Sequence, residues 1–334
     1  MKNKALKAAV FTAAVVAFSM GAGTVNAKLK RITIGSNPQG SVYFLLASGF
    51  AKLFQEQMGI RANAQPHAGS SVYLPLMEVG EITLGVNSSL DSGMAWSAVA
   101  PYKKATKKVR AIARVWILPY AYMVKESSGI KKMEDFKGKR VVVKYKTNVS
   151  LAQCNKVVLS SAGLTLNDIT AVESGGVVAS IGMVVQGRVD AAPVATAMPA
   201  LRKAHATVPG GLRIIPIGPK GTDEFLWKGM AGLYTVKQSN SKKKPFVKGN
   251  ITIAAFDSYL NAGSQVSNED AYRMAKAAYD NWKQMQKDYP PLRGTKHIAP
   301  SNNPIPYHPG AAKYYKEVGI YTNANAQNDA SLLK

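Results

Sequence analysis

The sequence contains a single cysteine, Cys154, among 334 residues. One thiol excludes an intramolecular disulfide, and it also excludes a structural zinc site made of several cysteines. The four histidines do not show the spacing of metal ligands. We therefore expect neither a metal site nor a cofactor. Cys154 lies in a helical pattern and is expected to be a small core residue.

Long hydrophobic runs are absent as well. The longest apolar stretch near the N-terminus, residues 8–18, follows Lys2, Lys4 and Lys7 and precedes small residues that end at Ala27. It is too short to span a bilayer comfortably. This pattern predicts a signal peptide at residues 1–27, cleavage after Ala27, and export through the Sec route to the periplasm.

Acidic residues are few: 19 Asp and Glu stand against 43 Lys and Arg, which gives a formal net charge of +24. Such an excess attracts anions and acidic surfaces. The lysines are spread along the chain, and an exported protein does not normally meet DNA, so nucleic acid is not an expected partner. Most lysines are expected to be solvated, and a basic interaction surface is the alternative.

Catalytic motifs are missing too. The loop GSNPQG at residues 35–40 is not followed by Gly-Lys-Ser/Thr and lacks the spacing of a dinucleotide site. Neither a GxSxG elbow nor a recognisable Ser/His/Asp or Cys/His set is present. The sequence therefore predicts a protein that is not an enzyme and has no catalytic residues.

What the sequence does contain is a strand, a polar loop and an amphipathic helix at residues 32–54. Apolar residues after the loop recur at helical spacing, for example Val42, Leu45 and Leu46. Unpaired backbone N–H groups at a helix start favour an anion. The loop is thus either one side of an anion pocket or an ordinary turn in which Ser41 caps the helix.

The same order of elements recurs about 107 residues later. Residues 140–143 predict a strand, residues 144–150 a polar loop, and a helix, a strand and a Gly/Ser loop follow. Gly80 and Gly187 precede matching strands in the two halves. Alternating strands and helices indicate parallel sheets with ligand loops at their carboxyl ends. We expect an α/β protein with two similar lobes that face a cleft.

Residues 109–124 form a nearly continuous apolar run that is interrupted by Pro119. This segment is expected to cross between the lobes. A strand is expected at residues 251–256, one helix at residues 269–289, and another after Pro309. Residues 218–249 are expected to be irregular. Lobe I then comprises residues 28–124 and 251–334, and lobe II comprises residues 125–250.

Several segments, taken in order, resemble the TAXI-type solute-binding proteins of tripartite ATP-independent periplasmic (TRAP) transporters. They include IGSNPQGSVYFLLASGFAKLF, AGSSVYLPLMEVGEITLGVNSS, GRVDAA and YHPGAAKYYKEVG. The resemblance implies a type II periplasmic-binding-protein fold with a hinge. It also implies capture of a small organic anion, a carboxylate or an amino acid such as glutamate, and delivery to TRAP membrane permease subunits driven by an ion gradient.

The resemblance aligns three loops with ligand-facing loops of that family: residues 36–43, residues 69–72 and the pair after the third strand. Arg114 interrupts an apolar strand, and a buried charge is costly without an anion partner. We therefore expect Arg114 or Lys146 to neutralise the ligand, or Arg114 to pair with a native carboxylate instead. Trp116 or Tyr43 would cover the carbon skeleton of the ligand.

Hydroxyl and amide side chains of lobe II are candidate donors, with capping and turn roles as the alternative. The predicted ligand-binding residues are Ser36, Gln39, Gly40, Ser41, Tyr43, Ser70, Ser71, Ser88, Ser89, Arg114, Trp116, Lys146, Thr147, Asn148, Ser150 and Thr196. The protein is expected to be a monomer. An ATP-driven importer would use a binding protein of the same fold, and a basic surface interaction protein is the alternative of a different class.

Overall fold

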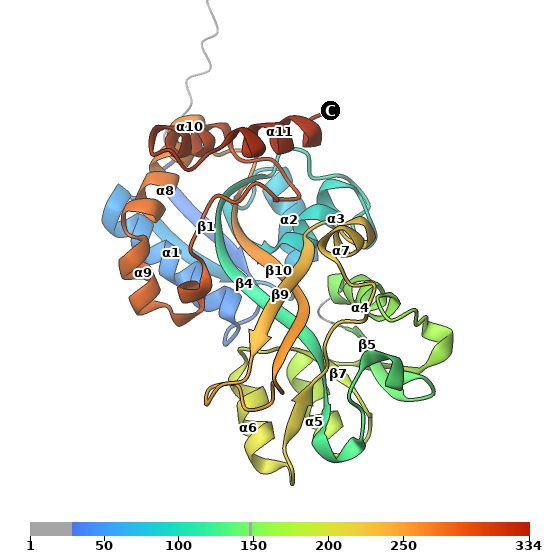
Figure 1. The fold of residues 1–334 in the computed structure, drawn as a ribbon. Helices are drawn as coiled ribbons and strands as arrows, with labels where there is room; N and C mark the ends of the chain where they lie inside the picture. The colour runs from blue at the N-terminus through green and yellow to red at the C-terminus, as the bar shows by residue number, and fades with distance from the viewer. Residues whose placement is uncertain (1–28, 147–148) are drawn as a thin grey trace, which may run out of the picture.

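The computed structural model describes residues 29–146 and 149–334. The predicted signal peptide, and Thr147 and Asn148 of the predicted site, lie outside the described residues. The chain forms two bodies (Figure 1): one carries β1, α1, α2 and the C-terminal helices, and the other carries β5, β7 and α4 to α6. The predicted α/β fold with two lobes is therefore confirmed.

The strands are β1 (Arg31–Ser36), β2 (Arg61–Pro66), β3 (Leu84–Ser88), β4 (Arg110–Lys125), β5 (Arg140–Tyr145), β6 (Thr170–Ser174), β7 (Ala192–Ala195), β8 (Leu212–Ile214), β9 (Leu233–Ser239) and β10 (Asn250–Ala262). The helices are α1 (Val42–Met58), α2 (Ser70–Glu78), α3 (Ser89–Trp96), α4 (Ser150–Ser160), α5 (Val177–Val185), α6 (Pro199–Thr207), α7 (Asp223–Gly229), α8 (Asn268–Asp280), α9 (Trp282–Asp288), α10 (Pro309–Glu317) and α11 (Asn323–Leu332).

The larger sheet has the strand order β2-β1-β3-β10-β4-β7, with β8 paired to β4 and β9 paired to β10. Strand β1 is parallel to both β2 and β3, and β10 runs antiparallel to β3 and β4. Ile32 and Ile34 of β1 are fully buried. Helix α1 follows β1 and packs against β1 and β2 with its buried face, which includes Leu46 and Phe50.

The second half repeats the first. Strand β5 is parallel to β6, and Val141 makes a parallel bridge to Ala191 just before β7. The order β1-α1-β2-α2-β3 thus matches β5-α4-β6-α5-β7, as the sequence predicted. Gly80 and Gly187 follow α2 and α5 with φ of +83° and +73°, a conformation that favours glycine where a helix must turn sharply into the next strand.

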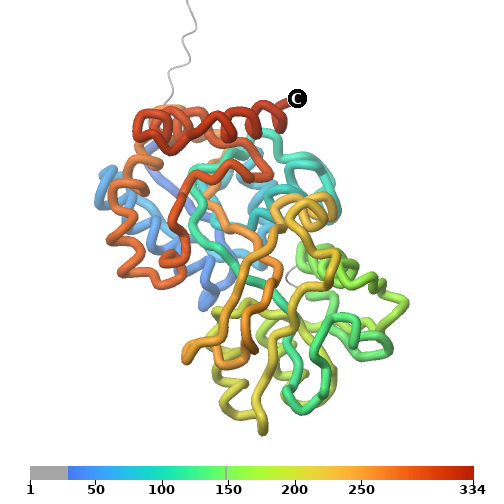
Figure 2. The backbone as a smooth tube through the Cα atoms, viewed as in Figure 1, coloured from blue at the N-terminus to red at the C-terminus, as the bar shows by residue number. Residues whose placement is uncertain are grey.

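Strands β4 and β10 belong to both lobes. Strand β4 pairs with β10 over most of its length, and its last residues pair with β7 and β8. Strand β10 pairs with β9 at its start and with β3 at its end. Figure 2 shows the two strands running together from one body into the other. The predicted lobe limits at residues 124 and 251 fall inside these shared strands.

The segment expected to cross between the lobes is one continuous strand, β4, and within it the Pro119 carbonyl oxygen accepts a hydrogen bond from Thr196 N–H at 3.0 Å. Two sequence expectations are corrected. The helix expected at residues 269–289 is two helices, α8 and α9, which are separated at Asn281. The stretch expected to be irregular, residues 218–249, contains α7 and β9.

In residues 29–146 and 149–334 no helix is long and apolar enough to cross a membrane.

Candidate functional site

A cavity of about 760 Å³ lies between the lobes, where strands end and helices begin. The starts of six helices line it: α1, α2 and α3 from lobe I, and α4, α5 and α6 from lobe II. Each of these helices follows a strand in the chain: β1, β2 and β3 in lobe I, and β5, β6 and β7 in lobe II. Both repeats therefore present their strand-end loops to one space, which is the arrangement that the repeat predicted.

On the lobe I side, two serines cap their helices. The Ser41 hydroxyl accepts a hydrogen bond from Phe44 N–H at 3.1 Å, and the Ser88 hydroxyl accepts one from Asp91 N–H at 3.1 Å. Both capping serines, Ser41 and Ser88, line the cavity. Helix α2 begins after Gly69, which has no side chain to act as a cap.

On the lobe II side of the cavity, the N-cap residues of the three helices, all in the described part of the chain, make no side-chain capping bond. Helices α4, α5 and α6 begin after Val149, Gly176 and Met198. All three residues line the cavity. The partial positive charge at these helix ends therefore faces the cavity without a capping oxygen from the N-cap residue.

The floor of the cavity is apolar and comes from the shared strands. Trp116, Leu118 and Tyr120 of β4 and Phe256 of β10 line it. The Trp116 ring meets the Tyr43 ring edge-on, with centroids 5.9 Å apart, and Tyr120 packs on Phe256 at 5.7 Å. These rings can cover the carbon skeleton of a ligand.

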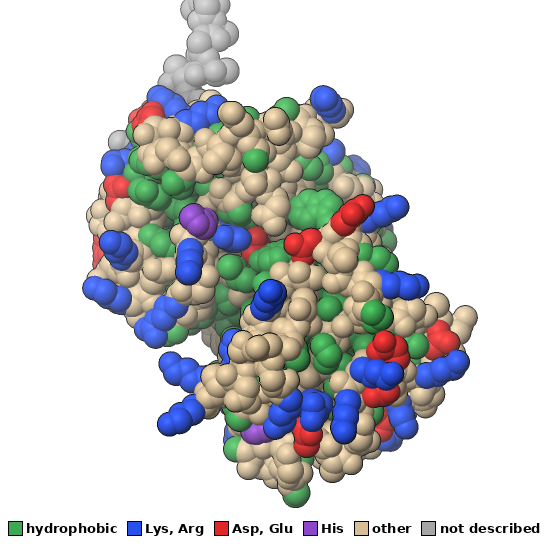
Figure 3. Space-filling view, viewed as in Figure 1, with side chains coloured by type: hydrophobic (Ala, Val, Ile, Leu, Met, Phe, Trp, Pro, Cys, Tyr) green, Lys and Arg blue, Asp and Glu red, His purple; other side chains and the backbone are tan. Residues whose placement is uncertain are grey.

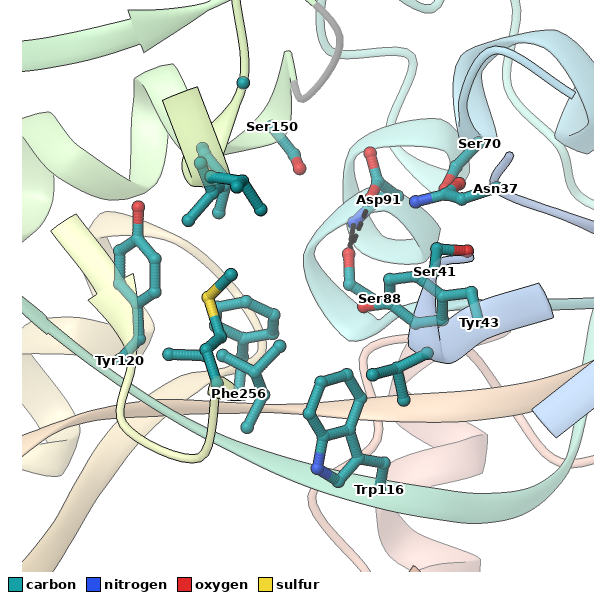
Figure 4. Close-up of a pocket in the computed structure, with 18 of the residues that line it drawn as sticks. Asn37, Ser41, Tyr43, Ser70, Ser88, Asp91, Trp116, Tyr120, Ser150 and Phe256 are labelled. Atoms are coloured by element: carbon teal, nitrogen blue, oxygen red, sulfur yellow. Dashed lines mark hydrogen bonds between the residues drawn. The ribbon is translucent and has the colours of Figure 1, made fainter. Parts of the chain in front are cut away.

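Among the described residues that line the cavity, Asp91 is the one with a charged side chain. Its carboxylate accepts hydrogen bonds from the Ser88 hydroxyl at 2.6 Å and the Tyr102 hydroxyl at 3.3 Å. Burial raises the pKa of Asp91, and the nearby hydroxyls of Ser88, Ser150, Tyr102 and Ser70 partly offset this. In Figure 4, Asn37, Ser70, Ser88 and Asp91 gather on one wall and Ser150 faces them from the other lobe.

Half of the predicted site residues line this cavity. They are Gly40, Ser41, Tyr43, Ser70, Ser71, Ser88, Trp116 and Ser150. Their role in binding stays a prediction, but their common position means that one ligand could reach all of them.

The other described predictions lie elsewhere. The Ser36 hydroxyl donates to the carbonyl oxygen of Asn37 at 3.1 Å, and the Ser89 hydroxyl donates to that of Gly232 at 3.4 Å. Gln39 and Lys146 are exposed and do not line the cavity. The Thr196 hydroxyl is buried beside the cavity wall, without a partner among the described residues.

Arg114 does not reach the cavity. Its guanidinium lies 3.2 Å from the carboxylate of Asp257 and donates to the carbonyl oxygen of His297 at 2.8 and 3.0 Å. The structure thus has the alternative arrangement, in which Arg114 pairs with a native carboxylate. Arg114 and Trp116 would share a face in a regular strand, but the pairing of β4 with β10 is irregular here. Ser258 pairs with Trp116 and Tyr259 pairs with Arg114, so β4 has one extra residue between them, and the alternation of faces is broken.

Sequence reasoning missed several lining residues. Asn37 belongs to the opening loop, and Asp91 lies three residues after the capping Ser88, a Ser-x-x-Asp spacing that indicates a helix start. That signal could have placed Asp91 beside the site. Gly175 and Gly176 belong to the Gly/Ser loop that the repeat predicts at the cleft, whereas residues 177–179 and 197–200 are small or apolar, and nothing in their side chains marks a binding loop. In the described part of the chain, no group of three His, Cys, Asp or Glu could hold a metal ion.

Comparison with known proteins gives the family and the fold of the chain. Residues 34–319 match the NMT1-like family. PhnD1 from Prochlorococcus marinus (MIT 9301), solved in complex with methylphosphonate, is 13% identical with a TM-score of 0.55, covering 87% of this chain and 99% of PhnD1. A TctC solute-binding protein from Polaromonas is 14% identical with a TM-score of 0.54, covering 91% of this chain and 96% of that protein. The chain therefore belongs to the NMT1-like family and has the two-lobed fold of periplasmic solute-binding proteins.

Proposed function

We propose that this protein is the periplasmic solute-binding subunit of a TRAP transporter. It captures a small solute that carries a carboxylate, either an organic anion or an amino acid, and delivers it to a membrane permease driven by an ion gradient. The observation that carries the proposal is the meeting of six helix starts at one cavity. The TRAP assignment is supported by the sequence resemblance.

The carboxylate is held by backbone N–H groups and hydroxyls, without a guanidinium. Arg114 is engaged by Asp257, and Lys146 is exposed outside the cavity lining. Helix starts bind anions through their unpaired N–H groups and their dipoles, and α4, α5 and α6 begin at residues without a capping side chain. This donor set replaces the cation that the sequence led us to expect.

Binding closes the two lobes about β4 and β10. Residues 28–124 and 251–334 act as lobe I and residues 125–250 as lobe II, and the boundaries fall within the shared strands. A ligand that contacts both walls stabilises the closed form and shifts the population toward it. The permease then recognises the closed form. In this proposal residues 1–27 direct export to the periplasm and are removed after Ala27.

The first test is to identify the ligand. The protein comprising residues 28–334 is purified from the periplasm, and the small molecule released on denaturation is identified by mass spectrometry. Thermal-shift titration with that molecule then checks its binding. A released molecule with a carboxylate, which raises the unfolding temperature, is the expected result. A ligand without any acidic group would contradict the proposal.

The second test concerns the transporter. Membrane vesicles that contain the permease take up the ligand only when the binding protein is added outside, and uptake needs an imposed ion gradient. Uptake that requires ATP instead would assign the protein to an ATP-driven importer. The face in Figure 3 bears Lys and Arg over both lobes, with Asp and Glu among them. The alternative function, interaction through a basic surface, predicts that the protein adheres to anionic vesicles without ligand. This adhesion is measured in the same experiment.

A further inference from the structure

The cavity is electrically polarised. Its one charged side chain in the described lining, Asp91, stands on the lobe I wall. The opposite wall holds the starts of α4, α5 and α6, whose dipoles place partial positive charge there. A simple carboxylate fits the lobe II wall but would be repelled by an ionised Asp91.

The surroundings of Asp91 fit a cationic nitrogen. Two hydroxyls, from Ser88 and Tyr102, donate to its carboxylate, and a carboxylate offers about four acceptor sites. The Asn37 side-chain oxygen is buried in the same wall and has no partner among the described residues. The hydroxyls of Ser70 and Ser150 can also accept. An ammonium group has three N–H donors and no acceptor, so it matches this cluster of oxygens.

The distance between the two charges of the ligand must be short. Ser150 is the first residue of α4, and α4 contacts α3, the helix that carries Asp91. Figure 4 shows Ser150 pointing toward Asp91 from the other lobe. The start of α4 and the Asp91 carboxylate are therefore neighbours, which suits a carboxylate and an ammonium on one carbon.

We infer that the cavity binds an α-amino acid with an apolar side chain. The ammonium group lies at Asp91, the carboxylate lies at the helix starts of lobe II, and the side chain packs on Trp116, Leu118 and Phe256. This inference rests on the proposed function and narrows its substrate class. It makes Asp91 the residue that separates amino acids from other carboxylates.

Three compounds with one skeleton test the inference: L-phenylalanine, 3-phenylpropanoate, which lacks the amine, and 2-phenylethylamine, which lacks the carboxylate. Their affinities for the purified full mature chain are measured by isothermal titration calorimetry after bound ligand has been removed by reversible unfolding. We expect L-phenylalanine to bind at least about 30-fold more tightly than either analogue, since each analogue leaves one buried charge-assisted contact unmade.

The matched variants are Asp91→Asn and Glu56→Gln. Asp91→Asn keeps an oxygen that can accept from Ser88 but removes the charge, and it should weaken L-phenylalanine binding about 30-fold without weakening 3-phenylpropanoate. Glu56→Gln removes the same charge from the exposed face of α1, and it should change neither affinity. If Asp91→Asn does not fold, the comparison of the three compounds on the natural protein decides alone.

The outcomes separate the two proposals. If 3-phenylpropanoate binds as tightly as L-phenylalanine, or if Asp91→Asn weakens both equally, the amino-acid inference is wrong and a carboxylate-binding function stands. If L-glutamate binds while no apolar amino acid does, the inference that the ligand has an apolar side chain is wrong. If no carboxylate binds and none is released from the purified protein, the proposed function itself fails.

Discussion

The guanidinium of Arg114 and the carboxylate of Asp257 lie 3.2 Å apart in a nearly solvent-free pair. Tyr234 donates a second hydrogen bond to Asp257 at 2.6 Å. Removing one partner of a buried ion pair leaves the other charge without compensation. Arg114→Met should therefore lower the free energy of unfolding by about 3–5 kcal/mol, as measured by urea denaturation, while ligand affinity of the folded protein stays unchanged.

The double variant Arg114→Met with Asp257→Asn is the control for this pair. It removes both charges, so it should recover part of the stability that the single variant loses. Loss of ligand binding in Arg114→Met at unchanged stability would contradict this account and return Arg114 to the site.

Val178 offers a way to test the lobe II wall by charge. It lies in the first turn of α5, lines the cavity and is 62% exposed. A negative charge there competes with a ligand carboxylate for the same helix start. Val178→Asp should weaken ligand binding about tenfold, or ~1.4 kcal/mol, as measured by calorimetry.

Val178→Asn is the uncharged control of nearly equal size, and it should bind more tightly than Val178→Asp. The difference between the two should shrink in high salt, because salt screens partly exposed charges. Equal affinities for the two variants would mean that the ligand carboxylate is not held at α5.

The buried, neutral ring of His308 leads us to expect that the protein loses stability in mild acid. Its Nδ1 accepts a hydrogen bond from Gly310 N–H, and its Nε2 lies 3.1 Å from the Val266 carbonyl oxygen, which needs the neutral ring with the proton on Nε2. Burial lowers the pKa of His308 from 6.5 to about 4. The neutral ring therefore stabilises the fold fully above pH 6.5, and this contribution falls as pH drops toward 4.

The size of this effect is about 3 kcal/mol at its upper limit. His308→Asn keeps an acceptor at the start of α10 but does not titrate. Unfolding midpoints measured from pH 7 to pH 4 should therefore fall more steeply for the natural protein than for His308→Asn. Parallel curves would show that His308 does not carry the acid sensitivity.

Gly310, near the start of α10, lies against the start of α8. A Cβ atom at this position would lie 2.0 Å from the backbone oxygen of Asn268. Backbone atoms cannot move aside cheaply, so Gly310→Ala should destabilise the protein by roughly 2 kcal/mol or more, as measured by thermal unfolding. Gly294→Ala, where a Cβ meets nothing within 4 Å, should be nearly neutral and serves as the control.

Much of the fold follows from the sequence because its signals are local. The strand–loop–helix units at residues 32–54 and 140–161 are recognised from the helical spacing of their apolar residues and from the small residues of their loops. Because the order of elements repeats, the sequence predicts two lobes. Serines at helix starts are equally visible: the sequence predicts Ser41, Ser70, Ser88 and Ser150 for the site, and all four line the cavity, while their role in binding stays a prediction.

What the sequence did not reveal depends on contacts between distant residues. Arg114 looked like an unpaired charge in an apolar strand, and its partner Asp257 is 143 residues away. The lobe II loops that end in Gly176 and Met198 bind through backbone groups in our proposal, and backbone groups leave no mark in the side-chain pattern. Asp91 is not predicted from the sequence because a site for an anion is expected to be lined by donors and cations, and a carboxylate would repel the ligand.

The continuous strands β4 and β10 set the mechanics of the molecule. Two lobes joined by flexible linkers could take up many relative orientations, but a hydrogen-bonded pair of strands resists bending and twisting over its whole length. If binding closes the lobes as we propose, the opening of the cleft is an elastic deformation with a restoring force. Because Trp116 and Phe256 project from the same two strands into the cavity, the shape of a bound ligand acts directly on the element that bends.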